Sequence, residues 1–144
     1  MSGGCLRGIE DDRWLMILKD DVIPLLLRAC PSYQSRWEMY CADLVYEPGL
    51  LYVDLADFAS HLVELLEENN TEEFSAVFEV IEQMHLDGDD FVREVATIGA
   101  LEGIQNIAGN RGVDPERFVP FLGKVSKRQW KKLNDFWNGK RLRI

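Results

Sequence analysis

Apolar residues recur every three or four positions along most of the chain, which is the spacing of one face of an α-helix. The pattern is clearest over residues 51–68, where it comprises Leu51, Leu55, Phe58, Leu62 and Leu65. After a short polar link, in which Asn70 or Thr71 is the expected helix cap, the same spacing returns in Phe74, Val77, Phe78, Ile81 and Met84. Two amphipathic helices are therefore predicted, with their apolar faces turned to a core.

A third helix is predicted from about Asp90 to Ile107, after the turn sequence LDGDD. Its apolar residues cover more of the circumference than in the two preceding helices, which is typical of a buried, central helix. Gly99 and Gly103 lie one turn apart within it. Because glycine has no side chain, these positions would let a neighbouring helix approach closely.

The first third of the chain predicts further helices. From Glu10 to Leu18, apolar residues follow an acidic start, which suits the positive end of a helix dipole. Pro24 fits either the first turn of a second helix, opened by Asp20 or Asp21, or a kink in one longer helix. A later helix is predicted with Ser32 as its cap and with one face formed by Tyr33, Trp37, Tyr40, Cys41 and Leu44.

The C-terminal third contains the clearest capping signals. Asp114 followed by Pro115 predicts the start of a short helix that runs to Gly123. Ser126 with Gln129 matches a capping box for the next helix. Two separate helices are therefore predicted in this region.

The last helix is predicted to end at Gly139, and Val125 with Trp130 would form a hydrophobic staple at its start. Its core face is predicted to contain Trp130, Leu133 and either Phe136 or Trp137. The basic residues predicted to face away from the core are Lys127, Arg128, Lys131 and Lys132.

Together these segments predict an all-α domain of about seven helices spanning residues 1–144, with residues 1–8 disordered and residues 140–144 as a tail. Short links favour antiparallel neighbours. We expect helical hairpins in a bundle or in a stack that resembles HEAT-type repeats, although no repeating residue signature is present.

Composition is that of a globular protein, with 47% apolar and 28% charged residues. No apolar run approaches the length of a membrane-spanning helix, and the N-terminus lacks a secretory pattern. The three cysteines Cys5, Cys30 and Cys41 have no CxxC spacing, which favours reduced thiols and a cytoplasmic location. Cys30 and Cys41 are expected in the core.

Charge is strongly segregated along the chain. Residues 47–102 contain fifteen acidic residues and one basic residue, whereas residues 103–144 contain three acidic and ten basic residues. An acidic helix face is often only a solvated face, and the basic C-terminal third would neutralise part of it by folding back. Like charges one turn apart nevertheless destabilise a helix, so we expect the acidic side chains to have a function.

We predict that this acidic surface binds a basic protein partner, because such a field attracts basic proteins and accelerates their association. The predicted partner-binding residues are Asp54, Asp57, His61, Glu64, Glu68, Glu72, Glu79, Glu82, Asp87 and Asp89. Anchoring would need aromatic residues as well, for which Trp37, Tyr46 and Tyr52 are candidates, although each is more typical of the core.

Other chemistry is not supported by the sequence. The acidic middle would repel phosphates, which excludes nucleic acid as its direct ligand. In LDGDDF, Phe91 occupies a position where a calcium loop needs an oxygen ligand. His61 and His85 have no second ligand at metal spacing, and no phosphate loop or serine elbow occurs. We therefore expect no metal, no cofactor, no membrane contact and no enzymatic activity.

The stretch from Leu51 to Asn110, with its acidic link, its DGDD turn and the helix ATIGALEGIQN, resembles a family of small all-α bacterial proteins. Several members of that family are immunity proteins of polymorphic or contact-dependent toxins. The resemblance implies an immunity protein that binds and neutralises a cognate toxin, such as a nuclease with a basic groove. The alternative is a non-catalytic helical adaptor or complex subunit that binds a basic protein. The oligomeric state stays undetermined.

Overall fold

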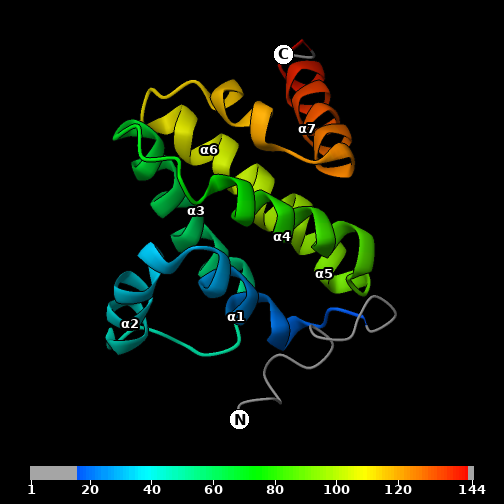
Figure 1. The fold of residues 1–144 in the computed structure, drawn as a ribbon. Helices are drawn as coiled ribbons and strands as arrows, with labels where there is room; N and C mark the ends of the chain where they lie inside the picture. The colour runs from blue at the N-terminus through cyan, green and yellow to red at the C-terminus, as the bar shows by residue number, and fades with distance from the viewer. Residues whose placement is uncertain (1–15, 143–144) are drawn as a thin grey trace.

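The computed structural model describes residues 16–142, and this part of the chain is all-α, as predicted (Figure 1). The elements are α1 (Lys19–Ala29), η2 (Pro31–Tyr33), α2 (Gln34–Ala42), α3 (Leu51–Glu67), α4 (Phe74–Asp87), α5 (Asp90–Glu94), η3 (Val95–Leu101), α6 (Glu102–Asn110), η4 (Pro115–Phe121) and α7 (Lys124–Leu142). Residues 16–142 contain no β-strand. A single parallel bridge joins Ile17 to Gly88.

Helix α3 packs extensively against the continuous helical segment α5–η3–α6. A Cβ atom at Gly99 would lie 3.2 Å from Cδ1 of Leu55, and one at Gly103 would lie 3.6 Å from Cβ of Ala59. Gly99 therefore allows the close approach that the sequence predicts, whereas a Cβ at Gly103 would make only an ordinary van der Waals contact. Residue numbers increase together along both contacting faces, so the two helices run parallel.

The predicted helix over residues 90–107 is present but contains a change of winding. Val95–Leu101 form a π-helix between the α-helical segments α5 and α6. A π-turn inserts extra backbone into a helix and rotates the residues that follow. Burial of Val92, Val95, Ala96, Leu101 and Ile104 confirms the central position predicted for this helix.

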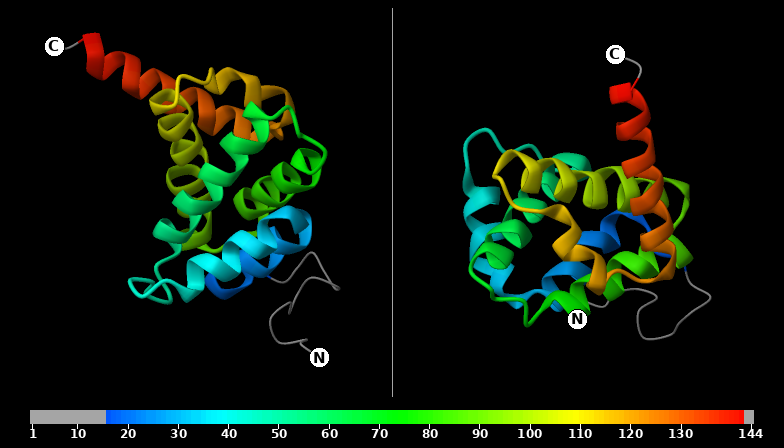
Figure 2. Two further views of the ribbon diagram at one scale, coloured as in Figure 1. Left: turned by 90° about the vertical axis from the view of Figure 1, so that its left-hand side faces the viewer. Right: turned by 90° about the horizontal axis from the view of Figure 1, so that it is seen from above.

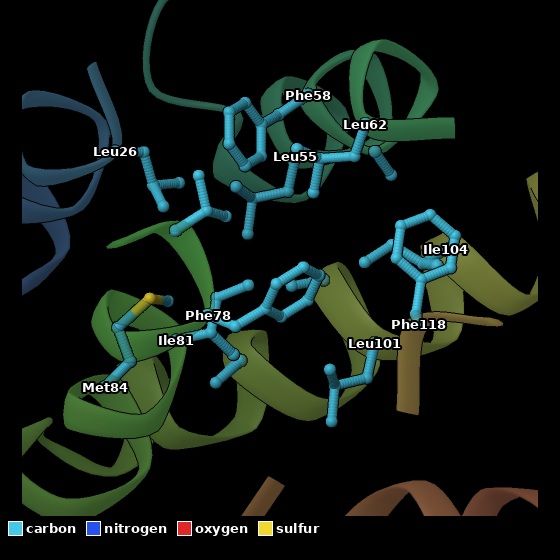
Figure 3. Packing of buried hydrophobic residues seen from close by; sticks show 14 of the residues in the cluster. Leu26, Leu55, Phe58, Leu62, Phe78, Ile81, Met84, Leu101, Ile104 and Phe118 are labelled. Atoms are coloured by element: carbon cyan, nitrogen blue, oxygen red, sulfur yellow. The ribbon is translucent and has the colours of Figure 1, made fainter. Parts of the chain in front are cut away.

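Helix α4 contacts α1, α5 and α7, and its apolar face meets those of α3 and α6 in one core (Figure 3). All ten apolar positions predicted for residues 51–84 are buried. The sequential pair α3 and α4 packs less extensively than α3 and α6, although the link between them is short. A short link therefore does not by itself determine which helices pack together.

Two expectations for the first third of the chain are wrong. Leu18 has extended backbone and its N–H donates to Oδ2 of Asp21 at 2.8 Å, so α1 begins at Lys19 and no helix runs through Leu18. The part of that predicted helix before residue 16 lies outside the described residues. Pro24 lies in the second turn of α1, which is neither of the two positions expected.

The helix after Pro31 also differs from expectation. A 3-10 turn begins at Pro31, so Ser32 does not cap α2. Tyr33 is buried, but Leu44 lies beyond the helix and is fully exposed. Of the two cysteines expected in the core, Cys30 is buried and Cys41 is only half-buried.

In the C-terminal third, η4 begins after Asp114 as predicted, and the side chain of Asp114 accepts the N–H of Glu116 at 3.0 Å. The capping box is wrong, because α7 begins at Lys124 and Ser126 lies buried inside its first turn. Helix α7 continues past Gly139 to Leu142 and projects from the body of the molecule (Figure 2). Trp130 and Leu133 are buried as predicted.

The sequence leaves open whether Phe136 or Trp137 belongs to the core face of α7. Phe136 is 58% exposed, whereas Trp137 is half-buried and its Nε1–H donates to Glu102 at 3.1 Å. Trp137 is therefore the residue that faces the rest of the molecule.

We predict that Gly88→Ala destabilises the protein, because a Cβ at this position would collide with the carbonyl oxygen of Met84 and with the side chain of Val92. Overpacking of this kind costs about 1–3 kcal/mol. The control is Gly109→Ala in α6, where a Cβ meets no atom within 4 Å and a gain of about 0.5–1 kcal/mol is expected. Urea unfolding measures the free energy of unfolding of both variants. Equal changes in the two would contradict the prediction.

Candidate partner-binding surface

The carboxylates along one side of α3 are covered by η2 and α2 and do not form the acidic surface that the sequence predicts. Tyr40 donates its hydroxyl to Asp54 at 2.9 Å, and Tyr33 donates to Asp57 at 2.7 Å. Arg36 donates to Asp57 at 3.2 Å and to Glu64 at 2.9 Å. The expectation that these carboxylates form an exposed acidic face is therefore wrong, because they hold η2 and α2 against α3.

Electrostatics at this contact favour neutral tyrosines and a charged arginine. Burial and the hydrogen bonds to the carboxylates raise the pKa values of Tyr33 and Tyr40. Burial opposes the charge of Arg36, but its hydrogen bonds to Asp57 and Glu64 raise its pKa overall. Asp54 is 4% exposed, and burial raises its pKa although the bond from Tyr40 acts in the opposite direction.

A second polar cluster ties α1 and η2 to α3 and to the start of α4. Glu73 accepts the Ser32 hydroxyl at 2.7 Å and the Cys30 thiol at 3.1 Å, and His61 Nε2 lies 2.9 Å from the Ser32 oxygen. Because Ser32 gives its proton to the carboxylate, the arrangement differs from a nucleophile whose proton goes to histidine. Burial raises the pKa of Cys30 to about 12, so its thiol stays protonated at neutral pH.

Glu82 caps α7 from a distant part of the chain. Its two oxygens accept the N–H groups of Val125 and Ser126 at 2.8 Å and 2.9 Å. Burial alone would raise the pKa of Glu82, but these two bonds lower it. Gly123 is required beside it, since a Cβ there would collide with the Glu82 side chain. Glu82 is therefore a structural residue, in contrast to its predicted exposure to a partner.

His85 lies next to this cap, between two hydroxyl groups. Its Nε2 is 2.9 Å from the Thr97 oxygen in η3, and its Nδ1 is 3.2 Å from the Ser126 oxygen in α7. Burial lowers the pKa of His85, so the ring is held neutral. A neutral imidazole has one donor and one acceptor, and two hydroxyls can satisfy both.

The remaining predicted residues divide into two groups. Asp89 caps α5 by accepting the N–H of Val92 at 2.9 Å, and the backbone carbonyl of Asp87 accepts the N–H of Ile17 at 2.9 Å. The exposed residues are Glu68, Glu72 and Glu79, on the α3–α4 turn and on α4. None of the three pairs with a basic side chain within residues 16–139.

Little of the basic C-terminal third neutralises the acidic middle. In the described part of the chain, one ion pair joins the two regions, from Arg111 to Glu67 at 2.6 Å. The four basic residues expected to face away from the core, Lys127, Arg128, Lys131 and Lys132, are indeed exposed. The separation of charge along the sequence therefore persists on the surface.

The α2–α3 link forms a depression that the periodicity did not indicate. Its volume is about 180 Å³, and it is lined by Tyr40, Asp43, Val45, Tyr46, Glu47, Leu50 and Val53. Of the three proposed aromatic anchors, only Tyr46 lines it. Trp37 packs beside Tyr40, and Tyr52 packs on Phe91. The sequence signal for this site is the presence of apolar residues on both sides of the break EPG that do not continue a helical period.

Two further findings concern the described residues alone. No helix among them is long and apolar enough to cross a bilayer, and they contain no group of three or more side chains suited to hold a metal ion.

The fold and these clusters define an all-α domain whose buried polar side chains mainly join one helix to another. The chain belongs to the family described as a domain of unknown function, DUF7674, which matches residues 23–138. The match begins within α1 and ends within α7. No curated protein and no solved structure matches the chain.

We predict that Asp57→Lys destabilises the fold, because it leaves the Tyr33 hydroxyl without its acceptor and places a second cation beside Arg36. Breaking a largely buried charge pair costs on the order of 3 kcal/mol. Glu68→Lys is the matched control, since Glu68 is exposed and has no basic partner within residues 16–139, and we expect a change of at most about 0.5 kcal/mol. Urea unfolding distinguishes the two, and an equally stable Asp57→Lys protein would refute the structural role of this cluster.

We also predict that acid destabilises the protein between pH 7.5 and 5.5. The pKa values of His85 and His61 are lowered from 6.5, chiefly by burial, so the unfolded chain binds more protons than the folded one below pH 6.5. Stability is therefore full at about pH 7.5, where the histidines of the unfolded chain are also neutral, and falls as the pH drops through 6.5 toward the lowered values.

The same urea experiment at several pH values tests this expectation. His85→Gln and His61→Gln should each remove part of the dependence. Measurements stop at pH 5.5 because Glu82 and Glu73, whose pKa values lie below 4.5, begin to contribute at lower pH. A constant unfolding free energy in the unmodified protein would contradict the prediction.

Proposed function

We propose that this protein is a cytoplasmic, non-catalytic immunity protein that binds a cognate basic toxin domain and neutralises it. The observation that carries the proposal is the set of exposed carboxylates Glu68, Glu72 and Glu79, which have no basic partner among the described residues. A toxin that cleaves nucleic acid has a basic substrate groove, and an acidic inhibitor covers such a groove or the surface beside it.

The geometry supports binding better than catalysis. The polar clusters around Asp57, Glu73 and Glu82 are occupied by hydrogen bonds between helices. The carboxylates of these clusters have stabilising partners. The thiol of Cys30, which donates to Glu73, has a raised pKa and is therefore a poor nucleophile. The exposed carboxylates, by contrast, are available to a partner without disturbing the core.

The compact core also suits a preformed binding surface. Glu79 lies on α4, and Glu68 and Glu72 lie in the turn between α3 and α4. Each of these two helices buries at least seven residues. Side chains on rigid helices lose less freedom on binding than side chains on mobile loops. Binding therefore requires little rearrangement of this part of the molecule.

We predict that Glu72→Lys/Glu79→Lys weakens binding to the cognate toxin at least tenfold, mainly through a slower association rate. The control is Asp20→Lys/Asp90→Lys, which changes net charge equally at exposed positions on α1 and α5. Capture of the tagged protein from its own bacterium, at low and high salt, identifies the partner. Growth rescue by co-expression then tests neutralisation.

Each outcome discriminates between functions. One stoichiometric, basic, secreted partner and rescued growth would support immunity. Capture of only housekeeping subunits would refute it and favour the helical adaptor. Equal affinity of the two double variants would show that Glu72 and Glu79 are merely solvated.

A further inference from the structure

The depression at the α2–α3 link combines exposed apolar side chains with two acidic ones. Its aliphatic lining residues Val45, Val53 and Leu50 are 87%, 53% and 44% exposed. Exposed apolar side chains rimmed by polar ones are a common feature of interaction sites. The link lies on the opposite side of the molecule from α7 (Figures 1 and 2).

The size of the depression indicates what can occupy it. Pockets for small-molecule ligands and cofactors enclose about 300–1,000 Å³, whereas this one encloses about 180 Å³. That volume suits a single apolar side chain presented by a peptide segment. Val45, Leu50 and Val53 supply the aliphatic wall.

The floor of the depression is held in place by contacts described above. Tyr40 is fixed by its hydrogen bond to the buried Asp54, and Tyr46 packs edge-on against Tyr40 with ring centroids 5.2 Å apart. Asp43 accepts the N–H of Val45 at 2.9 Å, which fixes the turn that carries Val45. A site organised before binding loses less conformational freedom when a ligand enters.

Charge identifies the chemistry of the ligand. Asp43 and Glu47 line the depression and no lysine or arginine does, and Glu47 has no ion-pair partner in residues 16–139. Phosphates, anionic lipid and acidic segments are therefore disfavoured. Lysine or arginine residues next to the apolar side chain would lie against the two carboxylates.

We propose that this depression binds an extended segment of a basic protein, with one aliphatic side chain between Val45 and Val53 and flanking lysine or arginine residues at Asp43 and Glu47. The inference rests on the proposed function, since it specifies the local chemistry of the basic partner. It involves surface separate from Glu72 and Glu79, so the two can be tested independently.

The probe is the peptide acetyl-Gly-Lys-Leu-Lys-Gly-amide, followed through the methyl signals of Val45, Leu50 and Val53 by NMR. We expect saturable shifts of these methyls. A peptide with glutamine in place of both lysines, and one with glycine in place of leucine, should each bind at least fivefold more weakly. Equal binding of the glutamine peptide, or shifts located elsewhere, would overturn the proposal.

Variants of the protein provide the matched controls. Glu47→Gln and Val45→Ser, both at exposed positions, should lower the affinity for the lysine peptide at least threefold. Glu72→Gln should leave that affinity unchanged. Methyl shifts that depend on protein concentration without peptide would show that a second copy covers the patch and would overturn the proposal. Loss of toxin binding in Glu72→Lys/Glu79→Lys with unchanged peptide binding would separate this site from the surface proposed above.

Discussion

The hydrogen bonds that η2 and α2 make to α3 decide how much of the negative charge of α3 reaches solvent. Without Tyr33, Arg36 and Tyr40, three carboxylates would lie along one side of a single helix and repel one another. With them, Asp54, Asp57 and Glu64 become acceptors that hold two helices together. The acidic surface that remains is consequently smaller than the sequence implies, and it is displaced toward the α3–α4 turn.

The sequence predicted the apolar faces of the helices well, because burial of apolar area is the dominant driving force of folding and the period of a helix is fixed. Leu55, Phe58 and Ile81 are buried for this reason. The same period shows that Asp57 faces away from the apolar side of α3. It does not show that another helix covers that direction, and this is why the partner-binding surface was predicted too widely.

Local rules also failed where the interaction was not local. Capping signals compare residues three or four apart, so they pointed to Ser126 and could not detect a cap contributed by Glu82, more than forty positions earlier. The helical period does not predict the depression near Val45, for a related reason. It is built from residues on both sides of an interruption in the helical period, and only the folded path of the link brings them together.

The cap from Glu82 also has a bearing on how the chain assembles. The first turn of α7 has backbone N–H groups that no residue of its own helix can satisfy, and two of them are satisfied by a side chain from α4. Contacts between residues so far apart form only after a long loop has closed. The start of α7 is thus stabilised only in chains where α4 is already in place, which couples the C-terminal helix to the middle of the chain.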